Sequence, residues 1–272
     1  MKQRLITGLS MFAFGLLIIY FGGTVFAVSS IVCFVFALYE EFHALSAAGH
    51  RPVSWPTWLA MTVSIPLGLI FGSQTVLPVL VAATFLITAS VLFRKNPELE
   101  DVLMSVTPLL SVVLPGLCII SLTTIEPLSV QRVYLALLVV VPVGCDSFAY
   151  FAGKRFGKTP FCPEVSPKKT VEGAIGGMVG AMTGAMLVSI FARVLCGPAT
   201  QPLLPSWLQM VAMGLVGGAV SQGGDLFASL IKRHCGVKDF SNLFPGHGGM
   251  LDRLDSILFM SVVVFCFRIV TA

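Results

Sequence analysis

The stretch SLIKRHCGVKDFSNLFPGHGGMLDRLD, residues 229–255, decides how this chain is arranged. It concentrates basic, acidic and histidine side chains around a turn rich in glycine and proline. Strongly apolar segments flank it on both sides. Charged groups at a membrane edge are costly to hold and usually serve a function. The pattern therefore indicates two membrane-spanning helices joined by a functional polar loop.

The composition of the whole chain indicates an integral membrane protein. Of its 272 residues, 56% are hydrophobic and 11% are charged. Soluble globular domains carry about 25% charged residues, and no long polar stretch here could form a separate soluble domain. The net charge of +4 is modest. Because the basic residues lie in short loops beside apolar segments, contact with membrane lipids is favoured and nucleic-acid binding is not.

We predict an all-α, polytopic membrane protein with about nine transmembrane helices, because one span needs about 20 largely apolar residues. The predicted spans are residues 5–21, 23–39, 57–72, 75–93, 102–122, 132–152, 173–195, 207–231 and 254–270. Only Gly22 and Gly23 separate the first two. We treat the chain as one membrane domain, in which residues 1–131 form a scaffold around a lipid cavity and residues 132–272 carry the catalytic helices and loops.

The distribution of lysine and arginine predicts the orientation, since cytoplasmic loops carry an excess of both. With a cytoplasmic N-terminus, every lysine and arginine lies on the inner side except Arg132, Arg193 and Arg268. Both polar motif regions then face the cytoplasm, where nucleotides are. We expect a multi-pass protein of the cell inner membrane.

Small residues recur at four-residue spacing in two of the predicted spans. Gly176, Gly180 and Gly184 follow this spacing in one, and Gly214 and Gly218 follow it in another. Such spacing lets helix backbones approach closely. Packing within one chain is the first interpretation, and the seam of a homodimer is the second.

Asp225 lies inside an apolar helix, where an isolated carboxylate is costly unless it is paired or binds a cation. Asp225, Ser229 and Lys232 fall on one helix face at i, i+4 and i+7. Asp225 is therefore either a structural partner of Lys232 or Arg233, or a metal ligand at the cytoplasmic edge.

Asp252 and Asp255 begin the last predicted span and share a helix face. Carboxylates are favoured at helix N-termini, so capping is the alternative to a functional role for Asp255. Asp225 and Asp252 come from adjacent helices joined by the polar loop. Together they offer the hard oxygen ligands that Mg²⁺ prefers. By contrast, His234, Cys235 and His247 do not have the spacing of a usual zinc site.

A second polar region precedes the first. It comprises DSFAYFAGKRFGK, residues 146–158, and SPKKTVEG, residues 166–173. Its lysines and arginines supply positive charge to a loop, with Lys154 and Lys168 as candidate phosphate contacts. Topology marking or contact with anionic lipid is the alternative for each lysine. No Walker A loop is present, so an ordinary P-loop NTPase is not indicated.

These residues together fill a long pattern: S-x-x-K-R, then K-D, then P-x-H-G-G-x-x-D-R-x-D. The filled positions are Ser229, Lys232, Arg233, Lys238, Asp239, Pro245, His247, Gly248, Gly249, Asp252, Arg253 and Asp255. The pattern resembles the signature of phosphatidate cytidylyltransferases, also called CDP-diacylglycerol synthases. The stretches at 146–158 and 166–173 resemble upstream motifs of the same family.

The resemblance implies that CTP and phosphatidate are converted to CDP-diacylglycerol and pyrophosphate. It also implies a Mg²⁺ ion, with K⁺ as a second cation. We expect cation binding by Asp225 and Asp252. The residues expected to act on substrate phosphates or the nucleotide are Lys232, Arg233, Lys238, Arg253, Asp146, Lys154, Lys168, Ser229 and His247. For His247 a loop-ordering or phosphate-contacting role is favoured over a general base, because a phosphate monoester is already ionised at neutral pH.

Two other functions compete with this one. A transporter or channel would also have many spans and intramembrane acids, but it predicts acids spread across the membrane depth and an internal repeat. Neither feature is evident in this sequence. The second alternative is a related CTP-dependent transferase that acts on another lipid acceptor, and the complete signature argues against it.

Overall fold

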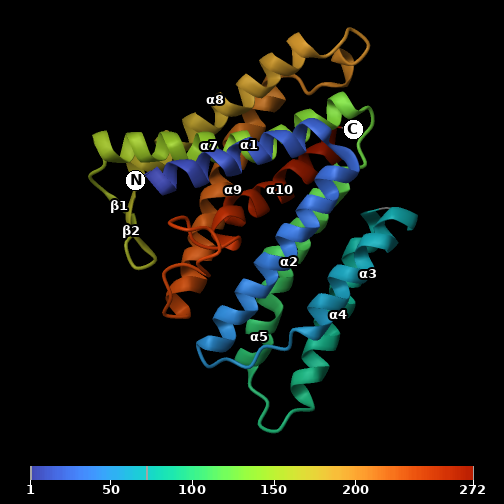
Figure 1. Cartoon of the computed structure of the whole chain (residues 1–272), viewed down its shortest axis with the longest axis vertical. Coiled ribbons are helices and arrows are strands. Elements are labelled where there is room, and N and C mark those ends of the chain that lie inside the picture. The colour runs from blue at the N-terminus through green and yellow to red at the C-terminus, as the bar shows by residue number, and fades with distance from the viewer. Residues whose placement is uncertain (1, 72, 272) are drawn as a thin grey trace.

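The computed structural model describes residues 2–71 and 73–271, with the side chains of 2–7, 9, 11, 12, 69, 71 and 73 excepted. Residue 72 of the third predicted span and the side chains of Lys2 and Arg4 therefore lie outside the description. The fold is helical, as predicted (Figure 1). Its elements are α1 (Lys2–Phe21), α2 (Gly23–Ala47), α3 (Trp55–Phe71), η1 (Ser73–Thr75), α4 (Val76–Leu92), α5 (Leu99–Pro108), η2 (Leu109–Val113), α6 (Leu114–Leu122), α7 (Leu128–Phe156), β1 (Pro160–Cys162), β2 (Ser166–Thr170), α8 (Val171–Leu195), η3 (Gln201–Leu203), α9 (Trp207–His234) and α10 (Leu251–Thr271).

Within the described residues, every predicted span coincides with a helix or a continuous helical run. In the part of the chain that the structure describes, five segments are long and apolar enough to cross a membrane: Gly23–Ala47, Leu99–Leu122, Leu128–Phe156, Val171–Leu195 and Leu251–Thr271. These segments confirm a polytopic membrane protein. The α9 helix is not among them, because its polar and glycine residues from Ser221 to Asp225 lower its hydropathy.

Two local features shape the N-terminal half. At Gly22 the backbone has a φ of 60°, and the Gln131 side chain of α7 accepts a hydrogen bond of 2.6 Å from the Gly23 N–H. The predicted break between the first two spans is thus confirmed. Between α5 and α6 the helix widens to a π-type turn at η2. Pro115 supplies no N–H to the helical ladder there, which explains the local departure from α-geometry.

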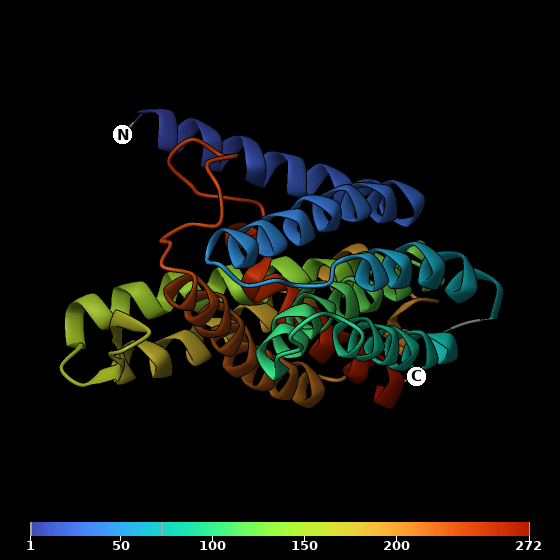
Figure 2. The same ribbon diagram turned by 90° about the horizontal axis from the view of Figure 1, so that it is seen from below.

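The C-terminal half is built on close helix packing through glycine. The α7 and α8 helices lie side by side, α9 packs on α8, and α10 packs on α9 (Figures 1 and 2). A Cβ atom at Gly184 would lie 3.0 Å from the Val140 carbonyl oxygen of α7, and one at Gly214 would lie 2.6 Å from the Met182 Cα of α8. These contacts confirm the interpretation of the glycine spacing as packing within one chain. A homodimer stays a prediction.

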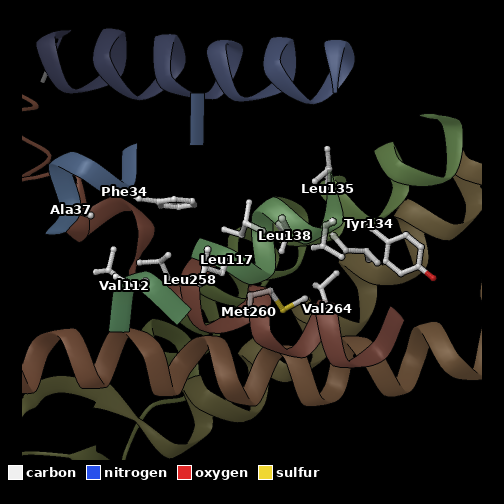
Figure 3. Close-up of a cluster of buried hydrophobic side chains, with 14 of the residues drawn as sticks. Phe34, Ala37, Val112, Leu117, Tyr134, Leu135, Leu138, Leu258, Met260 and Val264 are labelled. Atoms are coloured by element: carbon white, nitrogen blue, oxygen red, sulfur yellow. The ribbon is translucent and has the colours of Figure 1, made fainter. Parts of the chain in front are cut away.

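One buried hydrophobic cluster runs from α2 to α10. Figure 3 shows its centre, where Phe34 of α2, Leu117 of α6, Leu138 of α7 and Met260 of α10 converge. The division of the chain at residue 131 stays a prediction. The first and last described residues lie at opposite ends of the bundle (Figures 1 and 2). The polar loop between α9 and α10 lies at the same end as the start of α1.

Candidate functional site

Asp252 orders the polar loop between α9 and α10. Figure 2 shows the path of this loop. Asp252 is 7% exposed. Its Oδ1 lies 2.7 Å from Lys232 Nζ. Its Oδ2 accepts hydrogen bonds of 2.9 Å from the Phe240 and Gly249 N–H groups. Both oxygens of this carboxylate are therefore engaged by the protein, and they hold the loop against α9.

A second buried carboxylate, Glu40 of α2, holds the other side of the loop. Its Oε1 accepts hydrogen bonds from the Ser241 hydroxyl at 2.6 Å and from the Met250 N–H at 2.9 Å. Its Oε2 accepts one from the Leu251 N–H at 2.9 Å. Because Leu251 begins α10, Glu40 also places negative charge at the N-terminus of that helix, where the helix dipole favours it.

The two adjacent glycines of the loop are required by these carboxylates. Gly248 has a φ of 84°, and a Cβ there would lie 2.8 Å from Asp252 Oδ2. A Cβ at Gly249 would lie 2.5 Å from Glu40 Oε2. A side chain at either position would displace a buried carboxylate from its partners.

The second polar region meets α9 through a short hairpin. The β1 and β2 strands pair antiparallel between α7 and α8. On β2, Lys169 Nζ lies 2.6 Å from Asp225 Oδ2. Neighbouring side chains on a strand point to opposite faces. Lys168 is therefore directed away from Asp225, and it is exposed to solvent. Thr170 accepts a hydrogen bond of 3.1 Å from the Gly173 N–H and so caps α8.

Two further aspartates, from α7 and α10, lie within electrostatic range of Asp225. Asp146 of α7 is within electrostatic range of Asp225, Lys169 and Arg253. Asp255 of α10 is within range of Asp225 and Asp146. Asp255 lies beyond the first residues of α10 and accepts hydrogen bonds only from the adjacent Ser256 among the described residues, so the capping alternative does not explain it.

This donor set suits a hard divalent cation, which is bound through carboxylate oxygens. Asp225 already pairs with a positive group, and Asp146 accepts no hydrogen bond from the described residues. The three carboxylates are not drawn together within 4.8 Å in the part of the chain that is described. A shared ion therefore requires side-chain rotation and movement of Lys169. Asp252 can offer a metal ion only its Oδ1, because two backbone N–H groups engage Oδ2. The ion would compete with Lys232 for Oδ1.

The remaining predicted site residues differ in their contacts and exposure. Arg233 donates through Nε to the Val165 carbonyl at 3.4 Å and so contacts the hairpin. His247 lies against Gly8 of α1, and its buried Nδ1 has no hydrogen-bond partner among the described residues. The side chain of Ser229 is half-buried on α9. Positions exposed to solvent are Lys154, Lys168, Lys238 and Arg253.

The cysteine in the loop is not a nucleophile candidate. Cys235 directly follows α9 and is half-buried. Burial raises the pKa of its thiol, and the charge of Glu41 raises it further. The thiolate, which is the nucleophilic form, is therefore disfavoured.

Three residues of this region were not among the predicted site residues: Glu40, Lys169 and Asp255, for which helix capping is the alternative to a functional role. Glu40 could have been found from the sequence, because two adjacent glutamates, Glu40 and Glu41, near the end of an apolar helix are costly unless they have partners. Lys169 occupies the fixed lysine position of the upstream motif, and strand alternation separates it from Lys168.

Comparisons with known proteins identify the family. A model of the cytidylyltransferase family matches residues 2–270. The chain belongs to this family. It is 36% identical over 184 residues to a phosphatidate cytidylyltransferase of Bacillus subtilis (strain 168), covering 66% of this chain and 63% of the relative. It is 38% identical over 151 residues to the phosphatidate cytidylyltransferase of Aquifex aeolicus (strain VF5), covering 56% and 52%.

A third relative gives the same result on a shorter stretch. The phosphatidate cytidylyltransferase of Thermotoga maritima is 38% identical over 120 residues, which cover 44% of this chain and 43% of that protein. The chain covers less than two thirds of the length of each of these three relatives.

Proposed function

We propose that this protein is a phosphatidate cytidylyltransferase, which forms CDP-diacylglycerol and pyrophosphate from CTP and phosphatidate. The observation that carries the proposal is the group formed by Asp146, Asp225 and Asp255 with Lys169 and Arg253. It joins the two motif regions at the end of a membrane bundle. Family membership and the names of the relatives support the same reaction.

A lipid substrate is supported by an apolar pocket next to this group. The pocket has a volume of about 580 Å³ and lies between α6, α9 and α10. Phe259 lines it, one helical turn after Asp255 on α10. An acyl chain in this pocket would place a phosphate headgroup toward the aspartates. The pocket is lined by Leu110, Leu114, Pro115, Ala212, Met213, Val216, Val220, Phe259, Val262, Val263, Cys266, Phe267 and Val270.

The proposed reaction needs charge neutralisation more than acid–base chemistry. A phosphatidate oxygen attacks the α-phosphorus of CTP, a new P–O bond forms, and the bond to the pyrophosphate leaving group breaks. Positioning and electrostatic stabilisation dominate the catalysis of such transfers. Lys169 and Arg253 are within electrostatic range of Asp146, while Arg233, Lys238, Lys154 and Lys168 belong to the same two motif regions. We assign these groups to the triphosphate and the lipid phosphate.

We propose Mg²⁺ as the cofactor, with K⁺ as the second cation that the family resemblance implies. Asp225 is the principal ligand, because its carboxylate is half-exposed and both other aspartates lie within electrostatic range of it. Asp146 and Asp255 are the nearest further carboxylates, and Asp252 adds Oδ1. A divalent ion bound there would offset negative charge on the phosphates in the transition state.

We propose that this end of the bundle faces the cytoplasm across the cell inner membrane. The distribution of lysine and arginine supports this orientation, because only Arg132, Arg193 and Arg268 are assigned to the outer side. Each of these three arginines lies over an aromatic ring. Their guanidinium carbons are 5.0, 4.6 and 5.8 Å from the ring centroids. Aromatic side chains collect at membrane interfaces. The pairs are Arg132 with Tyr20, Arg193 with Trp207, and Arg268 with Tyr134.

The test is incorporation of labelled CTP into lipid by membranes that carry this protein, with phosphatidate and Mg²⁺. Asp225→Asn and Asp252→Asn are compared at matched expression. We expect CDP-diacylglycerol from the wild type and a loss of roughly 10²-fold or more for Asp225→Asn, in the range seen when one electrostatic contact to the transition state is removed. Asp252→Asn should also destabilise the folded protein, because Lys232 loses its partner.

The outcomes separate the parts of the proposal. A folded wild type that labels no lipid refutes phosphatidate as acceptor, and other lipid acceptors are then compared in the same assay. Full activity in Asp225→Asn would leave the enzyme assignment standing and remove Asp225 from the metal site. Activity without any divalent cation would refute the proposal that Mg²⁺ is the cofactor.

A further inference from the structure

Two histidines and a glutamate from distant segments meet at the edge of the bundle. His50 lies between α2 and α3, Glu100 lies in the first turn of α5, and His234 is the last residue of α9. His50 Nδ1 is 3.4 Å from Glu100 Oε1, and His234 Nε2 is 3.8 Å from the same oxygen. The two imidazole rings are stacked, with centroids 4.7 Å apart.

Glu100 differs from the acidic residues beside it. Asp101 is paired with Arg51 at 3.0 Å, and Glu98 lies 3.5 Å from the same arginine. Among the described residues, Glu100 forms no ion pair with a lysine or arginine, and only the two histidines face its carboxylate. The neighbouring carboxylates thus already have permanent cations, whereas this one is directed at two metal-ligating side chains.

The three ligand atoms lie close enough to reach a tetrahedral ion once the stacked rings rotate, because the lone pair of an imidazole nitrogen lies in the ring plane and parallel rings do not direct both lone pairs at one point. Zinc binds histidine nitrogen at about 2.0–2.1 Å, which gives about 3.4 Å between neighbouring ligand atoms. Here one ligand atom from each of the three residues lies within 4.8 Å of the others. The side chains are 17%, 53% and 43% exposed for His50, Glu100 and His234, so an ion can enter from solvent and water can complete the coordination.

We propose that His50, Glu100 and His234 form a binding site for a divalent transition-metal ion of the zinc class. Two imidazoles and one carboxylate are a ligand set that zinc accepts with one open position. Mg²⁺ prefers oxygen ligands and does not compete for imidazole. The site is separate from the aspartates assigned to the transferase. Bound metal would tie the end of α9, directly after Lys232 and Arg233, to the α2–α3 connection and α5.

The experiment is Zn²⁺ binding to the full-length protein in detergent micelles, purified with a tag that lacks histidine and stripped with a chelator. Zn²⁺ is titrated against a chromophoric competitor, and Co²⁺ absorption reports the coordination geometry. We expect one tight site per chain and a tetrahedral Co²⁺ spectrum. His50→Ala and Glu100→Gln should weaken binding by more than about 10–100-fold, the cost of losing even an outer partner of a ligand.

The matched control is His43→Ala, because His43 is exposed on α2 and stacked on Tyr39 away from the cluster. It should bind Zn²⁺ like the wild type, as should Cys235→Ser. Zn²⁺ should raise the unfolding temperature of the wild type and of both controls, and millimolar Mg²⁺ should not displace it. The proposal is overturned if the wild type binds no tighter than His50→Ala, or if His43→Ala loses as much affinity.

Discussion

Replacement of Glu40 by glutamine should destabilise the protein although no residue of the aspartate group is touched. Glu40 accepts three hydrogen bonds, from the Ser241 hydroxyl and the Met250 and Leu251 N–H groups. It is 5% exposed. In glutamine one oxygen becomes an NH₂ group, which cannot accept, so the Leu251 N–H faces a second donor.

The expected loss follows from these three bonds. A hydrogen bond to a charged group contributes about 1.5–3 kcal/mol and a neutral one about 0.5–1.5 kcal/mol. The two bonds that Oε1 of Glu40 can keep therefore weaken by about 1 kcal/mol each. The unpaired Leu251 N–H costs about 1–3 kcal/mol more. We expect Glu40→Gln to lower the free energy of unfolding by about 3–5 kcal/mol, which matches the cost of breaking a buried charge network.

The assay is unfolding of the purified protein in mixed micelles, followed by tryptophan fluorescence. The control is the same substitution at the next residue, Glu41→Gln. Glu41 is buried, but in the described structure it accepts hydrogen bonds only from the Ser111 hydroxyl. Glutamine can still accept that bond and removes a buried charge, and the new buried NH₂ group is the one donor left unpaired. Glu41→Gln should therefore cost no more than about 1–3 kcal/mol, the penalty of a single unsatisfied donor, and less than Glu40→Gln.

A second readout links the loop to function. Glu40 places the N-terminus of α10, which carries Asp252, Arg253 and Asp255. Glu40→Gln should therefore lower transferase activity even at temperatures where the protein stays folded. The reasoning is refuted if Glu40→Gln is no less stable than Glu41→Gln, since the three contacts would then contribute nothing.

Further predictions concern the loop and the hairpin. Gly249→Ala should destabilise the fold by about 1–3 kcal/mol through overpacking, and Gly68→Ala, with nothing within 4 Å of its Cβ position, should be neutral or stabilising in the same unfolding assay. Lys169→Ala should reduce CTP-dependent labelling roughly 10- to 100-fold, whereas Lys168→Ala should have a smaller effect; equal losses would contradict the assignment from strand alternation. Lys232→Met should lower the free energy of unfolding by about 3–5 kcal/mol, because it leaves the buried carboxylate of Asp252 without its ion-pair partner. Thermal unfolding measures this loss, and a clearly smaller change would contradict the prediction.

The sequence by itself determined the positions of the helices. Each apolar run became a helix, and the break at Gly22 was readable because glycine tolerates a φ of 60°. The motif residues were also identifiable, because their spacing is local: Asp225, Ser229 and Lys232 share a face through helix periodicity alone. These properties depend on residues within a few turns of one another, so they can be read along the chain.

Only the tertiary structure decided which of these groups meet. Helical periodicity does not show that Glu40 holds a loop some 200 residues later, that both oxygens of Asp252 are engaged, or that His50 stacks on His234. The pairing of Lys169 with Asp225 and the exposure of Lys168 appeared only with the β1–β2 hairpin. Such contacts depend on how helices pack and on where glycine allows close approach. That packing is set by the shape of the whole bundle and not by any one segment.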